Sequence, residues 1–171
     1  MIKRLFQLLA WLMVLLWMST IFFFSAQNAD VSGQISSSTT SKIIAEIYPG
    51  FDSLSPDEQA EIIHTAELIV RKIAHLAEFF ILSALIIIAL LFNDFLPINR
   101  AILAVLISLL YAATDEIHQL FSSGRACRLG DVLIDTCGAA IFATIYLLVS
   151  KIINRKNKKA SLVKGGGITE F

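Results

Sequence analysis

The sequence is short of charged residues and of cysteine. Aspartate, glutamate, lysine and arginine make up only 16% of its 171 residues, whereas soluble domains contain about 25%. The 14 basic and 14 acidic side chains balance, which excludes nucleic-acid binding through bulk positive charge. The two cysteines, Cys127 and Cys137, lack the paired spacing of a zinc site, and Cys137 lies in an apolar stretch. Neither a structural disulfide nor a cysteine-ligated zinc ion is therefore expected.

Hydrophobic side chains are abundant instead, at 56% of all residues, and the mean hydropathy is +0.73. Four stretches reach the roughly 20 apolar residues that cross a bilayer: Leu5–Phe24, Ile73–Phe92, Ala101–Leu120 and Asp131–Ser150. The first exceeds the signal-peptide core of about 7 to 15 residues and no small-x-small cleavage pattern follows it, so we expect it to be retained. The predicted fold is an all-α membrane protein, a bundle of about four transmembrane helices.

Lysine and arginine are distributed unevenly between the two sides of this four-span arrangement. One side carries Lys3, Arg4, Arg100 and the basic residues that follow Ser150. Because short cytoplasmic segments retain positive charge, this side is predicted to be cytoplasmic, with both termini inside. Residues 1–150 then form the membrane domain, and residues 151–171 form a basic, flexible cytoplasmic tail close to anionic lipid.

The predicted first outer loop, at about residues 25–71, contains a helix start. Ser55, Pro56 and Glu58 supply an N-cap, a proline at the first helical position and the acid of a capping box. Apolar residues then recur at helical spacing from Ile62 to Ile73, which predicts an amphipathic helix. Two arrangements remain open, because this helix could lie on the outer membrane surface or continue into the second span.

Ionisable residues gather at the predicted outer ends of three spans. Arg71, His75 and Glu78 follow i, i+4, i+7 spacing, which places them on one stripe of the second span. From their positions in the spans, Glu78, Asp115 and Asp135 lie about 6 to 8 Å below the outer boundary and are predicted to form one layer. Acids at such a depth usually face the bundle interior or a wet cavity. The third and fourth spans contribute Asp115, Glu116, His118, Gln119, Asp131 and Asp135 to this set.

Each of these residues also has a structural explanation. Polar residues within a turn of a helix end often mark only the membrane interface, although their coincidence across three helices favours a site. Arg125 and Arg128 lie in the predicted outer loop, against the positive-inside trend. They either form salt bridges to Asp131, Glu116 or lipid phosphate, or bind a phosphate-containing substrate, which suits the guanidinium group. Gly138, deeper in the fourth span, is expected to let a neighbouring helix approach.

Several short motifs occur together in this chain. They are Phe24-Ser25-Ala26-Gln27, Arg71-Lys72-Ile73-Ala74-His75 with Glu78, Asp115-Glu116-Ile117-His118-Gln119, Gly124-Arg125, and Asp131 with Asp135 and Gly138. In combination they resemble the VanZ-like family, which is named for a teicoplanin-resistance protein. The resemblance covers about Leu5 to Ser150, and Phe79 departs from it because a tyrosine is common there.

This resemblance implies a four-helix domain in a bacterial cytoplasmic membrane, with its polar cluster facing outside. It also implies a relation to enzymes that process lipid head groups and a role in tolerance to glycopeptide antibiotics such as teicoplanin. No residue pattern predicts an oligomeric state.

Three functions are consistent with these residues. The first is a hydrolase or transferase that acts on phosphate-linked lipid head groups or lipid-linked cell-wall intermediates, with His75 or His118 as general acid or base. The acids would orient the imidazoles or hold a divalent metal ion; they are Glu78, Asp115, Glu116, Asp131 and Asp135. Substrate phosphate would be bound by Arg71, Gln119, Arg125 and Arg128.

The second function is a non-catalytic membrane module that binds envelope lipids or limits antibiotic access. The third is a transporter, but the inner halves of the second, third and fourth spans carry no acidic residue that would continue a proton relay.

Overall fold

The computed structural model describes residues 2–25, 41–119 and 129–165, and every regular element in these ranges is helical. The four long helices are α1 (Ile2–Ser25), α3 (Pro56–Leu90), α4 (Pro97–Gln119) and α5 (Leu129–Gly165). Residues 41–47 form a short helix, and Phe51–Ser53 form the 3-10 turn η1. All four long helices are long and apolar enough to cross a membrane. The predicted all-α fold with four spans is confirmed.

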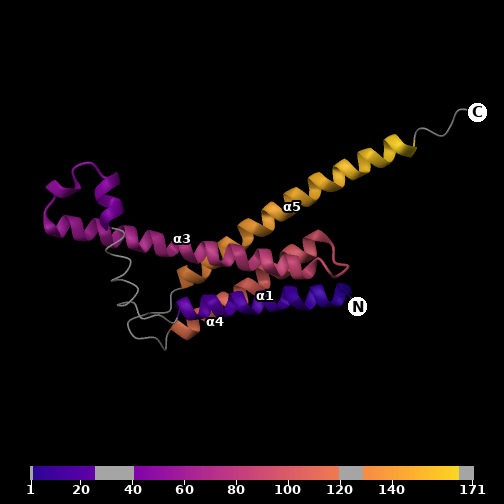
Figure 1. The fold of residues 1–171 in the computed structure, drawn as a ribbon, viewed down its shortest axis with the longest axis horizontal. Coiled ribbons are helices and arrows are strands. Elements are labelled where there is room, and N and C mark those ends of the chain that lie inside the picture. Colours follow the sequence, from indigo (N-terminus) through magenta and orange to yellow (C-terminus); the bar gives the residue numbers. More distant parts are fainter. Residues whose placement is uncertain (1, 26–40, 120–128, 166–171) are drawn as a thin grey trace, which may run out of the picture.

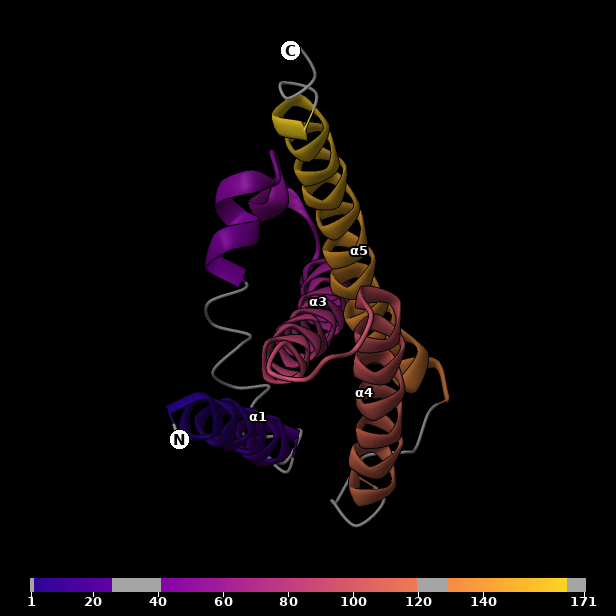
Figure 2. The same ribbon diagram turned by 90° about the vertical axis from the view of Figure 1, so that its right-hand side faces the viewer.

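Helix α3 lies at the centre of the bundle. It packs against α1 on one side and against α4 and α5 on the other (Figures 1 and 2). Successive long helices alternate in direction, and α5 crosses α3 before its C-terminal part extends beyond the other helices (Figure 1). The end of the bundle that carries Ser25, Asp115 and Asp135 is called the polar end below. The opposite end, which carries Arg4 and Arg100, is called the basic end.

Helix α3 begins at the predicted capping box. The Ser55 hydroxyl accepts a hydrogen bond from the Glu58 backbone N–H at 3.4 Å, and Glu58 Oε2 accepts one from the Ser55 backbone N–H at 2.9 Å. The helix is 35 residues long and uninterrupted, because no glycine or proline occurs between Asp57 and Leu90 to break it. The amphipathic stretch therefore continues into the second span, which decides between the two arrangements that the sequence left open.

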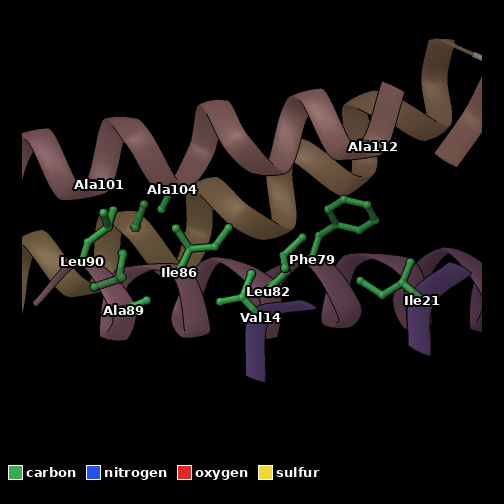
Figure 3. Close-up of a cluster of buried hydrophobic side chains, with 12 residues drawn as sticks. Val14, Ile21, Phe79, Leu82, Ile86, Ala89, Leu90, Ala101, Ala104 and Ala112 are labelled. Carbon is green, nitrogen blue, oxygen red and sulfur yellow. The ribbon is translucent and has the colours of Figure 1, made fainter. Parts of the chain in front are cut away.

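The core is built from large side chains of α3 and small side chains of its neighbours. Phe79, Leu82 and Ile86 of α3 are fully buried. They pack against Val14 and Ile21 of α1 on one side (Figure 3). On the other side they face a row of buried alanines on α4, namely Ala101, Ala104 and Ala112 (Figure 3). Small residues let helix backbones approach closely, and the resulting van der Waals contacts help to hold helices together where lipid replaces water.

Gly138 makes the closest approach between α3 and α5. A Cβ atom added to it would lie 2.2 Å from the backbone oxygen of Leu76, so only a residue without a side chain fits this position. The predicted approach of a neighbouring helix at Gly138 is observed. This contact brings the preceding turn of α5, which carries Asp135, next to the turn of α3 that carries His75.

Helix α5 continues beyond the predicted end of the fourth span. It ends at Gly165, so residues 151–165 of the predicted flexible tail are helical. The sequence from Lys151 to Lys164 contains no glycine or proline and is rich in lysine, which is a good helix former.

A set of hydrogen bonds centred on Arg100 holds the basic end together. Its guanidinium donates to the carbonyl oxygens of Leu90 at 3.2 Å and Asn93 at 2.8 Å, and to the Tyr146 hydroxyl at 3.2 Å. The side chain of Gln7 donates to that of Asn93 at 3.1 Å. Leu90 ends α3, where backbone carbonyls lack partners within the helix. The network thus joins α1, the α3–α4 connection, α4 and α5.

Candidate functional site

The polar end of the bundle brings together polar side chains from all four long helices. Ser25 is the last residue of α1, His75 and Glu78 lie within α3, Asp115 lies in the last turns of α4, and Asp135 lies in the second turn of α5. Ser25, Asp115 and Asp135 are buried, with exposed fractions of 2%, 3% and 4%. These residues are far apart in the sequence. They lie at the same end of the bundle because successive long helices run in alternate directions.

His75 occupies the contact between α3 and α5. Its Nδ1 atom lies 3.6 Å from Glu78 Oε2 and 3.8 Å from Asp135 Oδ1. These distances exceed those of an ordinary hydrogen bond, but they allow ion pairs to form when the imidazole is protonated. The side chains of His75 and Glu78 each remain 21% exposed, against 5% for that of Asp135. The imidazole is thus flanked by two carboxylates and is still accessible from outside the bundle.

Asp115 connects α4 to α1. The Ser25 hydroxyl donates a hydrogen bond of 2.9 Å to Asp115 Oδ2, and this bond is buried. Asp115 is also close enough to act electrostatically on Glu78 and Asp135. The structure therefore brings the three acids of the predicted layer together, one from each of α3, α4 and α5.

Further negative charge surrounds this layer. Asp131 and Glu116 both act electrostatically on Asp135, and Glu116 is itself buried, with 3% exposed. Repulsion among acids at this density is relieved either by protonation of a carboxyl group or by a counter-charge, which a protonated imidazole, an arginine or a bound cation can supply. Within the described ranges, no three or more His, Cys, Asp or Glu side chains are arranged to hold a metal ion. The divalent ion stays a prediction.

His118 is held by a different contact from His75. Its ring stacks on that of Phe22 from α1, with centroids 4.1 Å apart and planes inclined by 15°. Its Nε2 atom is buried and makes no hydrogen bond to the residues that the structure describes. This stacking could not be predicted, because Phe22 is one of three consecutive phenylalanines at the end of an apolar span.

Two aromatic side chains tie α1 to its neighbours beneath the site. The Trp17 indole donates a hydrogen bond of 2.9 Å to the backbone oxygen of Glu78, and the Tyr111 hydroxyl donates to the backbone oxygen of Met18 at 2.5 Å. Phe79, which follows Glu78, is fully buried and lies with its ring centroid 6.0 Å from that of Tyr111. A polar Tyr111 and an apolar Phe79 therefore lie in contact between the polar cluster and the hydrophobic core.

The predicted substrate-binding residues are only partly placed. Arg71 is exposed and lies one turn before His75 on α3. Gln119 is the last residue of α4, and its side chain lies outside the described residues, as do Arg125 and Arg128. Ser25 belongs to the motif Phe24-Ser25-Ala26-Gln27, but no role was predicted for it. The signal that could have identified it is its position, since it is a polar residue that ends an apolar span at the level of Asp115.

Comparison with known proteins identifies a family for the chain. The VanZ/LLP1 family model matches residues 10–150, a range that includes most of α1, all of α3 and α4, and α5 as far as Ser150. No curated protein and no solved structure gives a significant match. The four apolar helices indicate a multi-pass membrane protein, and the chain belongs to the VanZ/LLP1 family.

Proposed function

We propose that the protein acts at the polar end of its bundle on a phosphate-linked lipid head group or a lipid-linked cell-wall intermediate. The observation that carries this proposal is the environment of His75, a partly exposed imidazole between the carboxylates of Glu78 and Asp135. The distribution of lysine and arginine supports an orientation in which the polar end faces outside the bacterial cytoplasmic membrane and both termini face inside. The substrate would then lie in the outer leaflet.

His75 is suited to proton transfer in this reaction. Histidine exchanges a proton near neutral pH, and carboxylates beside Nδ1 orient the ring and stabilise its protonated form. In hydrolysis, Nε2 would take a proton from a water molecule as its oxygen attacks phosphorus. The bond from phosphorus to the leaving oxygen then breaks, and that oxygen receives the proton. In a transfer reaction, an acceptor hydroxyl takes the place of the water.

The substrate phosphate needs positive charge beside so many carboxylates. Arg125 and Arg128, with Arg71 and Gln119, are the proposed source, because guanidinium groups bind phosphate oxygens in pairs. A divalent ion held by the acids would neutralise charge in the same way. Glycopeptide tolerance is the proposed cellular consequence, since altered lipid-linked intermediates would change what an antibiotic such as teicoplanin meets at the cell surface.

Mass spectrometry of membrane lipids and lipid-linked cell-wall intermediates tests the proposal. Cells would express the wild type, His75→Gln, Asp115→Asn or the control His64→Gln at matched membrane levels. His64 is exposed on α3, outside the polar cluster. We expect one head-group species to change with the wild type and with His64→Gln, but not with the two site variants.

Two further outcomes decide between the alternatives. Identical lipid profiles in all strains, at adequate sensitivity, would replace catalysis by a module that binds envelope lipids or limits antibiotic access. If conversion is seen, repeating it on isolated membranes with a chelator and then with added Mg²⁺ or Zn²⁺ tests the metal. Equal conversion under all these conditions would contradict a role for the ion.

A further inference from the structure

A groove at the basic end of the bundle has a chemistry unlike that of the polar end. It has a volume of about 550 Å³ and lies between the start of α4 and the C-terminal extension of α5. Its apolar lining includes Leu96, Ile98 and Leu147, and its basic lining consists of Lys151, Arg155 and Lys158. None of the described residues that line it is acidic.

The three cations lie on one face of α5. Lys151, Arg155 and Lys158 follow i, i+4, i+7 spacing, so they are neighbours on the helix surface. All three are exposed. Like charges at these spacings repel one another. An anion bound between the three side chains would attract each of them and so offset this repulsion.

A smaller, apolar groove adjoins the first. It has a volume of about 280 Å³, lies between α4 and α5, and shares Ile98 and Leu147 with the basic groove. Ile102, Ala140 and Thr144 are among its other lining residues. From Lys151 to Ala140 the helix rises about 16 Å at 1.5 Å per residue, which is close to half of a hydrocarbon core about 30 Å thick. The two grooves together thus match the depth of one leaflet.

We propose that this composite groove binds one anionic diacyl phospholipid. Its phosphate-containing head group lies against Lys151, Arg155 and Lys158, and one acyl chain lies along the apolar groove between α4 and α5. Charge complementarity identifies this occupant, because a zwitterionic lipid carries no net charge to match three cations. Bound in this way, the lipid braces the helical extension of α5 against the start of α4. The site is separate from the polar end and does not depend on the function proposed there.

Native mass spectrometry of the full-length protein tests the proposal. The protein is equilibrated in detergent with equal amounts of phosphatidylglycerol and phosphatidylcholine, and bound lipids are counted. We expect one phosphatidylglycerol to be retained in preference to phosphatidylcholine. The variant Lys151→Gln/Arg155→Gln/Lys158→Gln should bind it about 100-fold more weakly. The control Lys3→Gln/Arg4→Gln/Lys156→Gln removes the same charge at residues that do not line the groove, and should retain the lipid.

A second pair of variants tests the acyl-chain part. Thr144 is exposed in the apolar groove, so Thr144→Phe places a ring where the chain lies and should displace phosphatidylglycerol without changing any charge. The control Ile141→Phe adds a ring to an exposed position of α5 outside both grooves. This pair decides the matter even if the triple variant does not fold.

Three results would overturn the proposal. The first is equal retention of phosphatidylglycerol by the folded triple variant and its charge-matched control. The second is no preference for phosphatidylglycerol over phosphatidylcholine in the wild type. The third is a lipid-free dimer that dissociates on Thr144→Phe, which would identify a second copy of the chain as the occupant.

Discussion

The two ends of the bundle use polar side chains in opposite ways. At the basic end, Arg100 donates hydrogen bonds to Leu90, Asn93 and Tyr146 and so joins several helices. At the polar end, the carboxylates beside His75 lie 3.6 and 3.8 Å from it, and the facing Asp135 Oδ1 has no hydrogen bond among the described residues. Satisfied polar groups stabilise a fold, whereas loosely held ionisable groups can change partners when a ligand arrives.

The largest effect is expected where the polar end depends on helix packing. Gly138→Ala should lower the free energy of unfolding by about 3 kcal/mol, because the new Cβ meets the backbone oxygen of Leu76, which cannot rotate away. It should also separate Asp135 from His75 and abolish the lipid change. Unfolding in mixed detergent micelles measures the loss. Gly130→Ala is the control, since its Cβ would meet nothing within 4 Å, and equal stability of the two variants would contradict the packing argument.

At the basic end, a stability loss without a loss of function is expected. Arg100→Gln removes a charged donor from two backbone carbonyls and should cost about 2 kcal/mol. The same unfolding assay measures this loss, with Arg4→Gln, exposed at the same end, as the control. Lipid conversion per folded molecule should stay at the wild-type level. A fall in conversion at equal folded amount would show that the two ends are coupled.

A smaller effect is expected from the buried hydrogen bond that joins α1 to α4 at the polar end. Ser25→Ala removes the donor to Asp115 and should cost about 1 kcal/mol. Ser19→Ala serves as the matched control, because the exposed Ser19 hydroxyl bonds only within its own helix. If the two variants unfold alike, the hydrogen bond from Ser25 to Asp115 contributes no stability.

The smallest effect on stability is expected from removing a charge of the polar cluster. Asp135→Asn keeps the shape of the side chain, loses the ion pair with His75 and relieves repulsion among the acids. These changes oppose each other, so the free energy of unfolding should shift by no more than about 0.5 kcal/mol while lipid conversion is lost. Parallel unfolding and lipid measurements test both parts. A loss of stability above about 2 kcal/mol would instead make Asp135 a structural residue.

The positions of the spans could be predicted because length and hydrophobicity decide them. The capping box at Ser55 was predicted for a similar local reason, since its residues lie within one turn. The end of α5 was not predicted, because the lysine-rich segment after Ser150 forms a helix without being apolar. A hydropathy criterion detects membrane spans and gives no information on a helix that leaves the membrane.

The composition of the polar end was predictable in part. Helical spacing placed His75 and Glu78 on one stripe, and alternating helix directions placed Asp115 and Asp135 at the same end. The contacts of Ser25 with Asp115 and of Phe22 with His118 were missed. Each of them depends on how two helices are rotated about their own axes, which no periodicity within one helix reveals.

The number of spans, the start of α3 and the separation of acidic from basic residues could all be predicted from the order of residues along the chain. These follow from local hydrophobicity, capping and charge, which act within a few turns of one helix. The packing of the helices against one another sets which acid faces His75, which helix Asp115 contacts and where a groove opens between α4 and α5. Those outcomes depend on helix rotation and separation, which are set by steric contacts between distant residues such as Gly138 and Leu76.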